Sequence, residues 1–254
     1  MDQTVKICKA LLCLGKSLTH ATTEGNEKEV FDCLNLALEL YEENESSRDE
    51  DYATLIFLIG EAYLKFEHHD KALAQFQEAL THYRAIFGKN HASTTRPLVK
   101  IAVCLIRNRQ HDEAMELLDE AYQLLRTYGY NNSLHNAEIQ FNKGIILVET
   151  GKLNGAIDAY EKSLDIRSEK LGGNSIEVAQ VLNNIGSVFA RNKEYQRALK
   201  PWQDAIEIYK SLGLGDEDPK VSCTRGNIAI SKNLRSPSPT TNKLRRIILE
   251  NKIL

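Results

Sequence analysis

Residues 179–210 read AQVLNNIGSVFARNKEYQRALKPWQDAIEIYK, and this stretch decides the fold. Its first half has one apolar stripe at helical spacing, with a glycine near the centre, formed by Leu182, Ile185, Gly186 and Phe189. Because glycine has no side chain, a second helix can approach closely at this point. The first half therefore predicts a helix with a close neighbour.

The second half predicts that neighbour. After a polar turn at 191–194, small residues alternate with one large ring in the order Ala198, Trp202, Ala205 and Ile206. Since the two stripes are complementary in size, residues 179–210 predict two antiparallel helices joined by a short turn, a helical hairpin.

The hairpin recurs every 42 residues. The close-contact position of the first stripe is Gly60, Ala102, Gly144 and Gly186. The large position of the second stripe is Phe76, Leu118, Tyr160 and Trp202, and the small position before it is Ala72, Ala114, Ala156 and Ala198. The sequence thus predicts four hairpins, at about 53–87, 92–128, 134–170 and 176–212. Asn90, Asn132, Asn174 and Asp216 keep the same spacing and suit a turn or a helix cap.

The ends of the chain depart from this register. Residues 4–20 and 28–41 predict two helices of a divergent N-terminal cap, and 220–233 predicts a single C-terminal capping helix. The expected domains are therefore a cap at 1–50, a repeat array at 51–233 and a flexible basic tail at 234–254.

The small-large-small pattern resembles the tetratricopeptide repeat, although the usual unit has about 34 residues and ends in proline. The longer unit, with the segments LGGN at 171–174 and LNNIG at 182–186, is similar to the kinesin light chain subclass. The resemblance covers about residues 53–230. It implies an all-α protein, a right-handed α-solenoid (superhelix) in which each hairpin packs only on its neighbours.

The resemblance also implies a binding groove, into which the fifth, ninth and twelfth residues of each unit point. These positions are Phe57, Glu61, Leu64, Val99, Val103, Ile106, Phe141, Ile145, Val148, Asn183, Ser187 and Ala190. Adjacent positions supply a largely basic rim, formed by Lys65, Arg96, Lys100, Arg107, Asn142, Asn184 and Arg191. An apolar floor with such a rim suits an amphipathic helix or an extended peptide with acidic flanks. The alternative is that the apolar residues pack within and between hairpins.

Two subclasses of this family can be compared. Chaperone-binding members grip a peptide's C-terminus with a clamp of lysines, arginines and asparagines, but Phe57 and Glu61 occupy two of the clamp positions. Only Arg96 and Lys100 resemble the clamp, and this subclass is therefore disfavoured.

Kinesin light chains present asparagines that bind a peptide's backbone. Asn183 and Asn184 match that feature, and Asn142 matches it in part. The heptad coiled coil that joins those proteins to the motor subunit has no counterpart in residues 1–50, which argues against a cargo-adaptor role within a motor.

These features favour a non-catalytic scaffold or adaptor that binds a linear or helical segment of a protein partner. The alternative is a regulatory subunit that covers an enzyme or a motor, which includes a cargo adaptor like kinesin light chain. No catalytic, metal-binding or cofactor-binding motif is recognised, since His68 and His69 lack a partner at metal-ligand spacing. We therefore expect no enzyme activity and no cofactor.

Composition sets further expectations. No apolar run reaches the length of a membrane span, and five scattered cysteines fit reduced thiols in a cytoplasmic protein. Residues 231–254 carry a net charge of +5 and the remainder −8, which argues against nucleic acid binding along the solenoid. The oligomeric state is left open.

The tail contains two Ser-Pro sites, Ser236 and Ser238, which are candidates for phosphorylation by a proline-directed kinase. Residues 244–254 combine branched apolar side chains with two arginines. This segment suits a short helix that docks in a groove, either the protein's own or a partner's.

Overall fold

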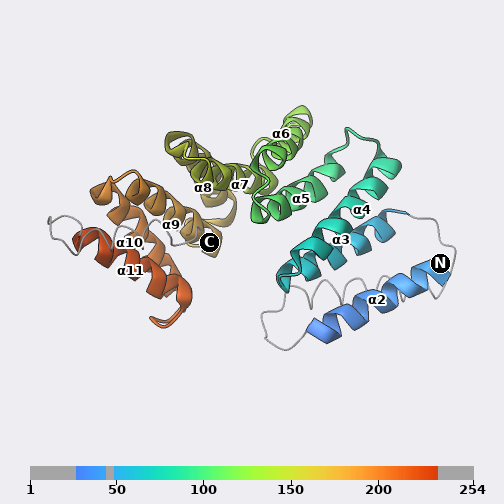
Figure 1. The fold of residues 1–254 in the computed structure, drawn as a ribbon, viewed down its shortest axis with the longest axis horizontal. Helices are drawn as coiled ribbons and strands as arrows, with labels where there is room; N and C mark the ends of the chain where they lie inside the picture. Colours follow the sequence, from blue (N-terminus) through green and yellow to red (C-terminus); the bar gives the residue numbers. More distant parts are fainter. Residues whose placement is uncertain (1–26, 44–48, 234–254) are drawn as a thin grey trace. The chain divides into compact units, whose positions relative to one another are not determined.

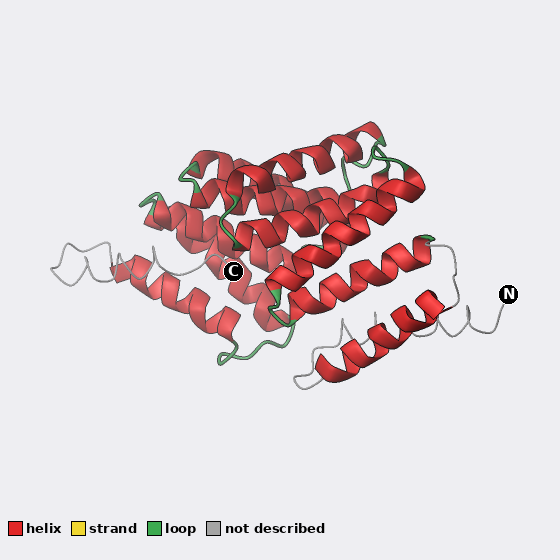
Figure 2. Cartoon of the chain, turned by 45° about the vertical axis from the view of Figure 1, so that its right-hand side comes forward, coloured by secondary structure: helices red, strands yellow, loops and turns green. Residues whose placement is uncertain are grey.

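The computed structural model describes residues 27–43 and 49–233, and every regular element in these ranges is a helix (Figure 2). The all-α prediction is therefore confirmed. By its contacts the chain divides into two compact units, Met1–Gly129 and Tyr130–Leu254. Each unit is described by itself.

The first unit contains α2 to α6 (Figure 1, blue to green). Its helices are α2 (Glu27–Glu43), α3 (Glu50–Lys65), α4 (His69–Phe87), α5 (Thr95–Arg107) and α6 (His111–Thr127), with a short 3-10 turn at Ala92–Thr94 before α5. The helices of each hairpin, α3 with α4 and α5 with α6, share the most extensive contacts, and α2 packs against α3.

The second unit repeats this plan (Figure 1, yellow to red). It consists of α7 (Leu134–Glu149), α8 (Leu153–Leu171), α9 (Ile176–Arg191), α10 (Tyr195–Ser211) and α11 (Pro219–Asn233). The pairs α7 with α8 and α9 with α10 are hairpins, while α11 packs mainly against α10. The first helices of the four hairpins are thus α3, α5, α7 and α9, and the second helices are α4, α6, α8 and α10.

A glycine of the first helix faces a ring of the second helix in three hairpins, as the register predicts. A Cβ atom on Gly144 would lie 2.5 Å from the Tyr160 ring, and one on Gly186 would lie 2.6 Å from the Trp202 ring. At Gly60 the corresponding distance to the Phe76 ring is 2.7 Å. The second hairpin has Ala102 and the smaller Leu118, so a larger first residue accompanies a smaller partner.

The turn within each hairpin also keeps the register. One residue per turn has a positive φ, and these residues are Glu67, Arg109, Gly151 and Lys193. They let the chain reverse between the two helices. Only the third turn uses glycine, the residue for which this backbone conformation carries no steric cost.

In the second, third and fourth hairpins, the capping residue lies one position after Asn90, Asn132 and Asn174, which the sequence assigns to a turn or a cap. Asp49, Ser133 and Ser175 each accept a hydrogen bond from the backbone N–H three residues on, and the His91 ring caps the 3-10 turn. Asn132 and Asn174 instead tie the loop to the last turn of the second helix, through Glu169 and Ser211. Of the two uses that the sequence left open, a turn or a cap, Asn132 and Asn174 serve the turn.

Several predictions concern the ends of the chain. The helices expected at 28–41 and 220–233 are found as α2 and α11. The helix expected at 4–20, the sites Ser236 and Ser238, and the whole segment 234–254 lie outside the described residues. The domain limits at 50 and 233 stay predictions.

Candidate functional site

In the first unit, α3 and α5 are joined by side chains from the expected binding positions. Lys100 Nζ lies 3.6 Å from Glu61 Oε1, and both side chains are mostly buried. The guanidinium of Arg96 lies 4.5 Å from the centre of the Phe57 ring, which gives a cation–π contact. Lys100 and Arg96, the two residues that resemble the chaperone clamp, therefore already have partners.

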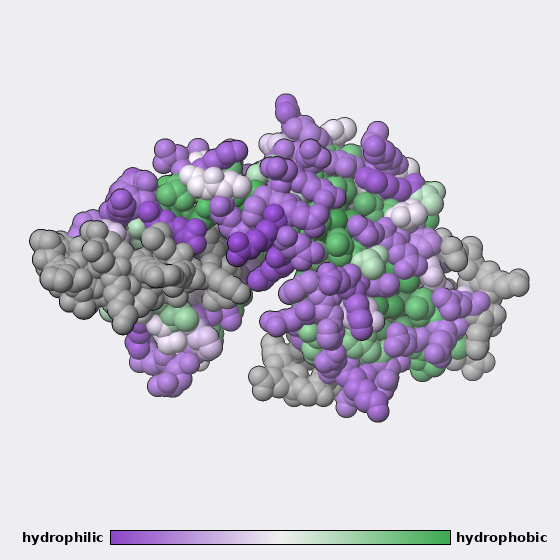
Figure 3. Space-filling view, in the orientation of Figure 1, coloured by the Kyte–Doolittle hydropathy of each residue, from purple (hydrophilic) through white to green (hydrophobic). Residues whose placement is uncertain are grey.

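The structure separates the expected groove residues of this unit into covered and accessible ones. Phe57, Val99 and Ile106 are buried, because Phe57 packs on Phe76 under Arg96 and the others lie in the packed side of α5. They support the wall and do not form its surface. The accessible set, called the α3–α5 surface below, contains Leu64, Lys65, Arg96, Val103 and Arg107. Figure 3 shows apolar side chains reaching the surface of this unit between polar ones.

In the second unit, the aromatic residue at the corresponding position of α7 is again covered by an arginine. The Arg167 guanidinium lies 4.7 Å from the centre of the Phe141 ring, and that ring lies 5.6 Å from the Tyr160 ring. Val148 and Ala190 are buried. The half-buried residues, called the α7–α9 surface below, are Phe141, Ile145, Asn183, Ser187 and Arg191.

The asparagines expected to bind a peptide's backbone are engaged or covered. Asn142 donates to the Glu138 carbonyl of its own helix at 2.9 Å. Asn183 accepts a hydrogen bond from the Thr224 hydroxyl on α11, at 3.0 Å. Asn184 is fully buried, and no hydrogen-bond partner satisfies its amide in the described residues. A partner's backbone would have to displace the hydrogen bonds of Asn142 and Asn183, and Asn184 is out of its reach because it is buried.

Asn184 lies beside another buried polar group, the hydroxyl of Tyr160. Burial raises the pKa of Tyr160, and the nearby Arg191 and Asn184 oppose that rise. The phenol is therefore neutral at physiological pH, and it serves the packing of α8 on Gly144. Trp202, the equivalent residue of the fourth hairpin, is held by a hydrogen bond, since its ring N–H donates to the Asn183 carbonyl at 3.0 Å.

The sequence did not predict that arginines cover aromatic rings, although it assigned Arg96 to the groove rim. Arg96 covers Phe57, Arg167 covers Phe141, and Arg197 lies 4.2 Å from the centre of the Phe189 ring. One signal was present for Arg167. The residues at the equivalent positions, 42 residues apart, are large and mostly aromatic, namely Tyr83, Leu125 and Tyr209. An arginine at such a packed position is expected to lie against a ring.

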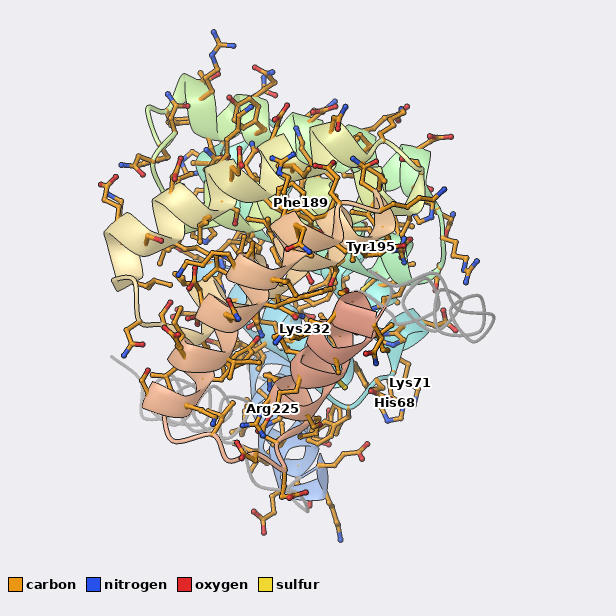
Figure 4. The ribbon with its side chains drawn as sticks, turned by 90° about the vertical axis from the view of Figure 1, so that its left-hand side faces the viewer. His68, Lys71, Phe189, Tyr195, Arg225 and Lys232 are labelled. Atoms are coloured by element: carbon orange, nitrogen blue, oxygen red, sulfur yellow. The ribbon has the colours of Figure 1, made fainter. Side chains whose placement is uncertain are left out.

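The described residues contain no group of three or more histidine, cysteine, aspartate or glutamate side chains that could hold a metal ion. His68, labelled with Lys71 at the start of α4 in Figure 4, bonds to Glu27 at 3.0 Å. Burial raises the pKa of the Cys104 thiol to about 11, so this thiol is protonated at neutral pH. Over the described ranges, no helix combines the length and the hydropathy that a bilayer crossing requires.

Hairpins with one close-contact geometry, repeated at a fixed interval, define the α-solenoid class of repeat proteins. The family model described as tetratricopeptide repeat matches residues 69–127 and 135–211, more than half of the chain. The chain belongs to the tetratricopeptide repeat family, and the family predicted from the sequence is confirmed.

The named relatives agree with this family. The chain is 25% identical over 198 residues to a clustered mitochondria protein homolog of Xenopus tropicalis, covering 78% of this chain and 15% of that protein. It is 21% identical over 199 residues to kinesin light chain-related 3 of Arabidopsis thaliana, covering 75% of this chain and 29% of that protein. The likeness to kinesin light chains is thus confirmed, and the chain spans less than a third of either relative's length.

Among solved structures, NprR in complex with its cognate peptide NprX has the same fold. The two share a TM-score of 0.66 at 15% identity, with 98% of this chain and 67% of that one covered.

Proposed function

We propose that this protein is an interaction module that binds a linear segment of a protein partner on the first helices of its hairpins. The observation that carries the proposal is the α3–α5 surface. There Leu64 and Val103 are partly exposed apolar side chains, and the cationic side chains of Lys65, Arg96 and Arg107 are exposed around them. The two helices are held together by the contacts between Glu61 and Lys100 and between Phe57 and Arg96.

This surface suits a partner with apolar anchors and acidic flanks. Apolar side chains of the partner would be desolvated against Leu64 and Val103, which supplies most of the affinity. Exposed arginines attract carboxylates and speed association, and salt weakens that attraction. Affinity is therefore expected to fall as the salt concentration rises.

The α7–α9 surface is the equivalent surface of the second unit, and it would bind a linear segment in the same way. It is more polar, since Asn183, Ser187 and Arg191 accompany Phe141 and Ile145. The NprR structure contains a peptide, which shows that a protein with this fold can bind one. NprR supports the proposal at the level of the fold alone, and its peptide is a ligand of NprR.

A random-peptide display library panned on the intact protein would supply a peptide ligand even though the partner is unidentified. The affinity of a selected peptide is then measured by fluorescence anisotropy for the wild type, Val103→Asp and Arg107→Glu. We expect each variant to weaken binding about tenfold, which corresponds to about 1.4 kcal/mol.

Arg126→Glu is the matched control, because Arg126 is an exposed arginine on the second helix α6. It should bind like the wild type. If Val103→Asp and Arg107→Glu keep the wild-type affinity while their helical circular dichroism is intact, the α3–α5 surface is not the binding site.

A further inference from the structure

Helix α11 has the position of a first helix, yet the described residues contain no second helix for it. It packs on the preceding hairpin through Val221, Thr224, Asn227 and Ser231, all of which are buried. The bond from Thr224 to Asn183 fixes its contact with α9. In the other hairpins a turn of a few residues and a second helix follow at this point.

The side of α11 that should receive a second helix is open in the described part of the chain. Gly226 lies 40 residues after Gly186, and a Cβ atom on Gly226 would meet nothing within 4 Å. In contrast, Gly60, Gly144 and Gly186 each have a ring at 2.5–2.7 Å from the same point. Figure 4 looks onto α11, with Arg225 and Lys232 labelled, and no described helix lies in front of it.

The residues along this open side are small. Ser222, Cys223 and Ala229 are exposed, and Gly226 is half-buried between them. Gly226 lies four residues after Ser222, three after Cys223 and three before Ala229, so the four residues lie on one side of the helix. Such a side accepts a second helix whose own contact residues are bulky. The Ala102 and Leu118 pair is the reverse case, in which a larger residue on the first helix meets a smaller one on the second.

We propose that residues 240–254 of the same chain cover this side as the second helix of a fifth hairpin. The chain continues directly from Asn233, and 21 residues follow it, which is enough for a turn and a helix of three to four turns. Because the segment is tethered to α11, its effective concentration there is high.

The repeat register supports this occupant. Leu244, Ile247 and Ile248 lie 42 residues after Trp202, Ala205 and Ile206, and they recur with helical spacing. The separation from the small residue of the first helix to the large residue is 18 here, from Gly226 to Leu244, and 16 in the four described hairpins. The two added residues fall in the connection that contains Pro237 and Pro239.

Cys223 is a natural reporter for this contact. Of the cysteines in the described residues, Cys33 and Cys104 are buried and Cys223 is exposed. Maleimide labelling of intact protein, followed by mass spectrometry of the peptide that contains Cys223, measures how often the open side is uncovered. Leu244→Asp combined with Ile248→Asp should speed this labelling about tenfold over the wild type.

The matched control is Leu249→Asp, because position 249 lies off the stripe of 244, 247 and 248. It should label like the wild type, and the labelling of Cys33 and Cys104 should be unchanged in every variant, which shows that the hairpins remain folded. Equal labelling of Cys223 in the wild type and the double variant overturns the proposal. Protection of Cys223 that grows with protein concentration also overturns it, since a second copy would then be the occupant.

Discussion

The Tyr160 ring occupies the space that any side chain at position 144 would need. The ring is fully buried, and the distance of 2.5 Å from a Cβ at Gly144 is too short for a simple adjustment. Three hairpins use this glycine and ring pair, whereas the second uses Ala102 with Leu118. A larger residue on the first helix is therefore compensated by a smaller one on the second. The combined volume of the two residues constrains the hairpin more than the identity of either one.

We expect Gly144→Ala to lower the free energy of unfolding by about 1–3 kcal/mol, because the added methyl group forces the ring out of its place. Urea unfolding followed by circular dichroism measures this loss. Adding Tyr160→Leu reproduces the Ala102 and Leu118 pair and should recover part of it.

Gly155→Ala in α8 is the control, since a Cβ atom there would make only an ordinary contact, 3.6 Å from Leu147 Cδ1. There the helix propensity of alanine should dominate and raise stability by about 0.5–1 kcal/mol. A loss of equal size at both glycines would contradict the close-contact explanation.

Arg167 is a buried arginine at a position that is large and mostly aromatic elsewhere. Its guanidinium lies on Phe141 and donates to the Glu177 carbonyl at 3.1 Å, while burial lowers its pKa. Because Leu125 occupies the equivalent position, we expect Arg167→Leu to keep the stability of the wild type within about 1 kcal/mol.

Arg167→Ala should instead cost about 1–3 kcal/mol, since it removes the packing along with the charge. Thermal unfolding of both variants separates the two effects. If leucine destabilises as much as alanine, the positive charge and its hydrogen bond are required and packing alone is not enough.

At the scale of the element, the turns within the hairpins carry a recurring backbone cost. Lys193 has a φ of 63°, where the third hairpin has Gly151 with a φ of 77°. Lys193→Gly should raise the free energy of unfolding by about 0.5–1 kcal/mol, because glycine adopts this conformation without steric cost.

Lys152→Gly serves as the comparison, because Lys152 has a φ of −86° and gains no relief from glycine. It should lower stability slightly or leave it unchanged. Denaturant titrations of the two variants side by side check the difference, and a stabilisation at both positions would show that the sign of φ is not its cause.

The helices and hairpin pairing were predictable because size alternation and spacing are local properties of the chain. The sequence left open whether each loop asparagine forms a turn or a cap, since asparagine suits both about equally. Here Asn132 uses its amide to hold Glu169, and Ser133 accepts the helix bond instead. Only the packing of the loop on the last turn of α8, the second helix of the same hairpin, distinguishes these two uses.

At the scale of the molecule, each unit has its own hairpins and its own internal contacts. Repeat proteins derive their stability from contacts between neighbouring hairpins, and each unit contains two such hairpins. We expect fragments 1–129 and 130–254 to keep helical circular dichroism and cooperative thermal unfolding when they are made separately. A fragment without helical signal would show that the two units fold only together.

The sequence proposed positions for a binding groove but could not tell which of their side chains would be covered. Phe57 and Leu64 hold equivalent status in the register, yet Arg96 and Phe76 bury the first and leave the second partly exposed. The covering arginine comes from the next hairpin, and the sequence assigned it to the groove rim without indicating that it would lie on Phe57. Such contacts depend on three-dimensional packing.

Hydroxyl-radical footprinting with a selected peptide tests most directly whether the first helices bind the partner. Oxidation of Leu64 and Val103 should fall when the peptide is added, while Ile86 on α4 and Leu212 after α10, both exposed, should be oxidised as before. Protection of Ile86 or Leu212 with no change at Leu64 and Val103 would contradict the proposed binding surface.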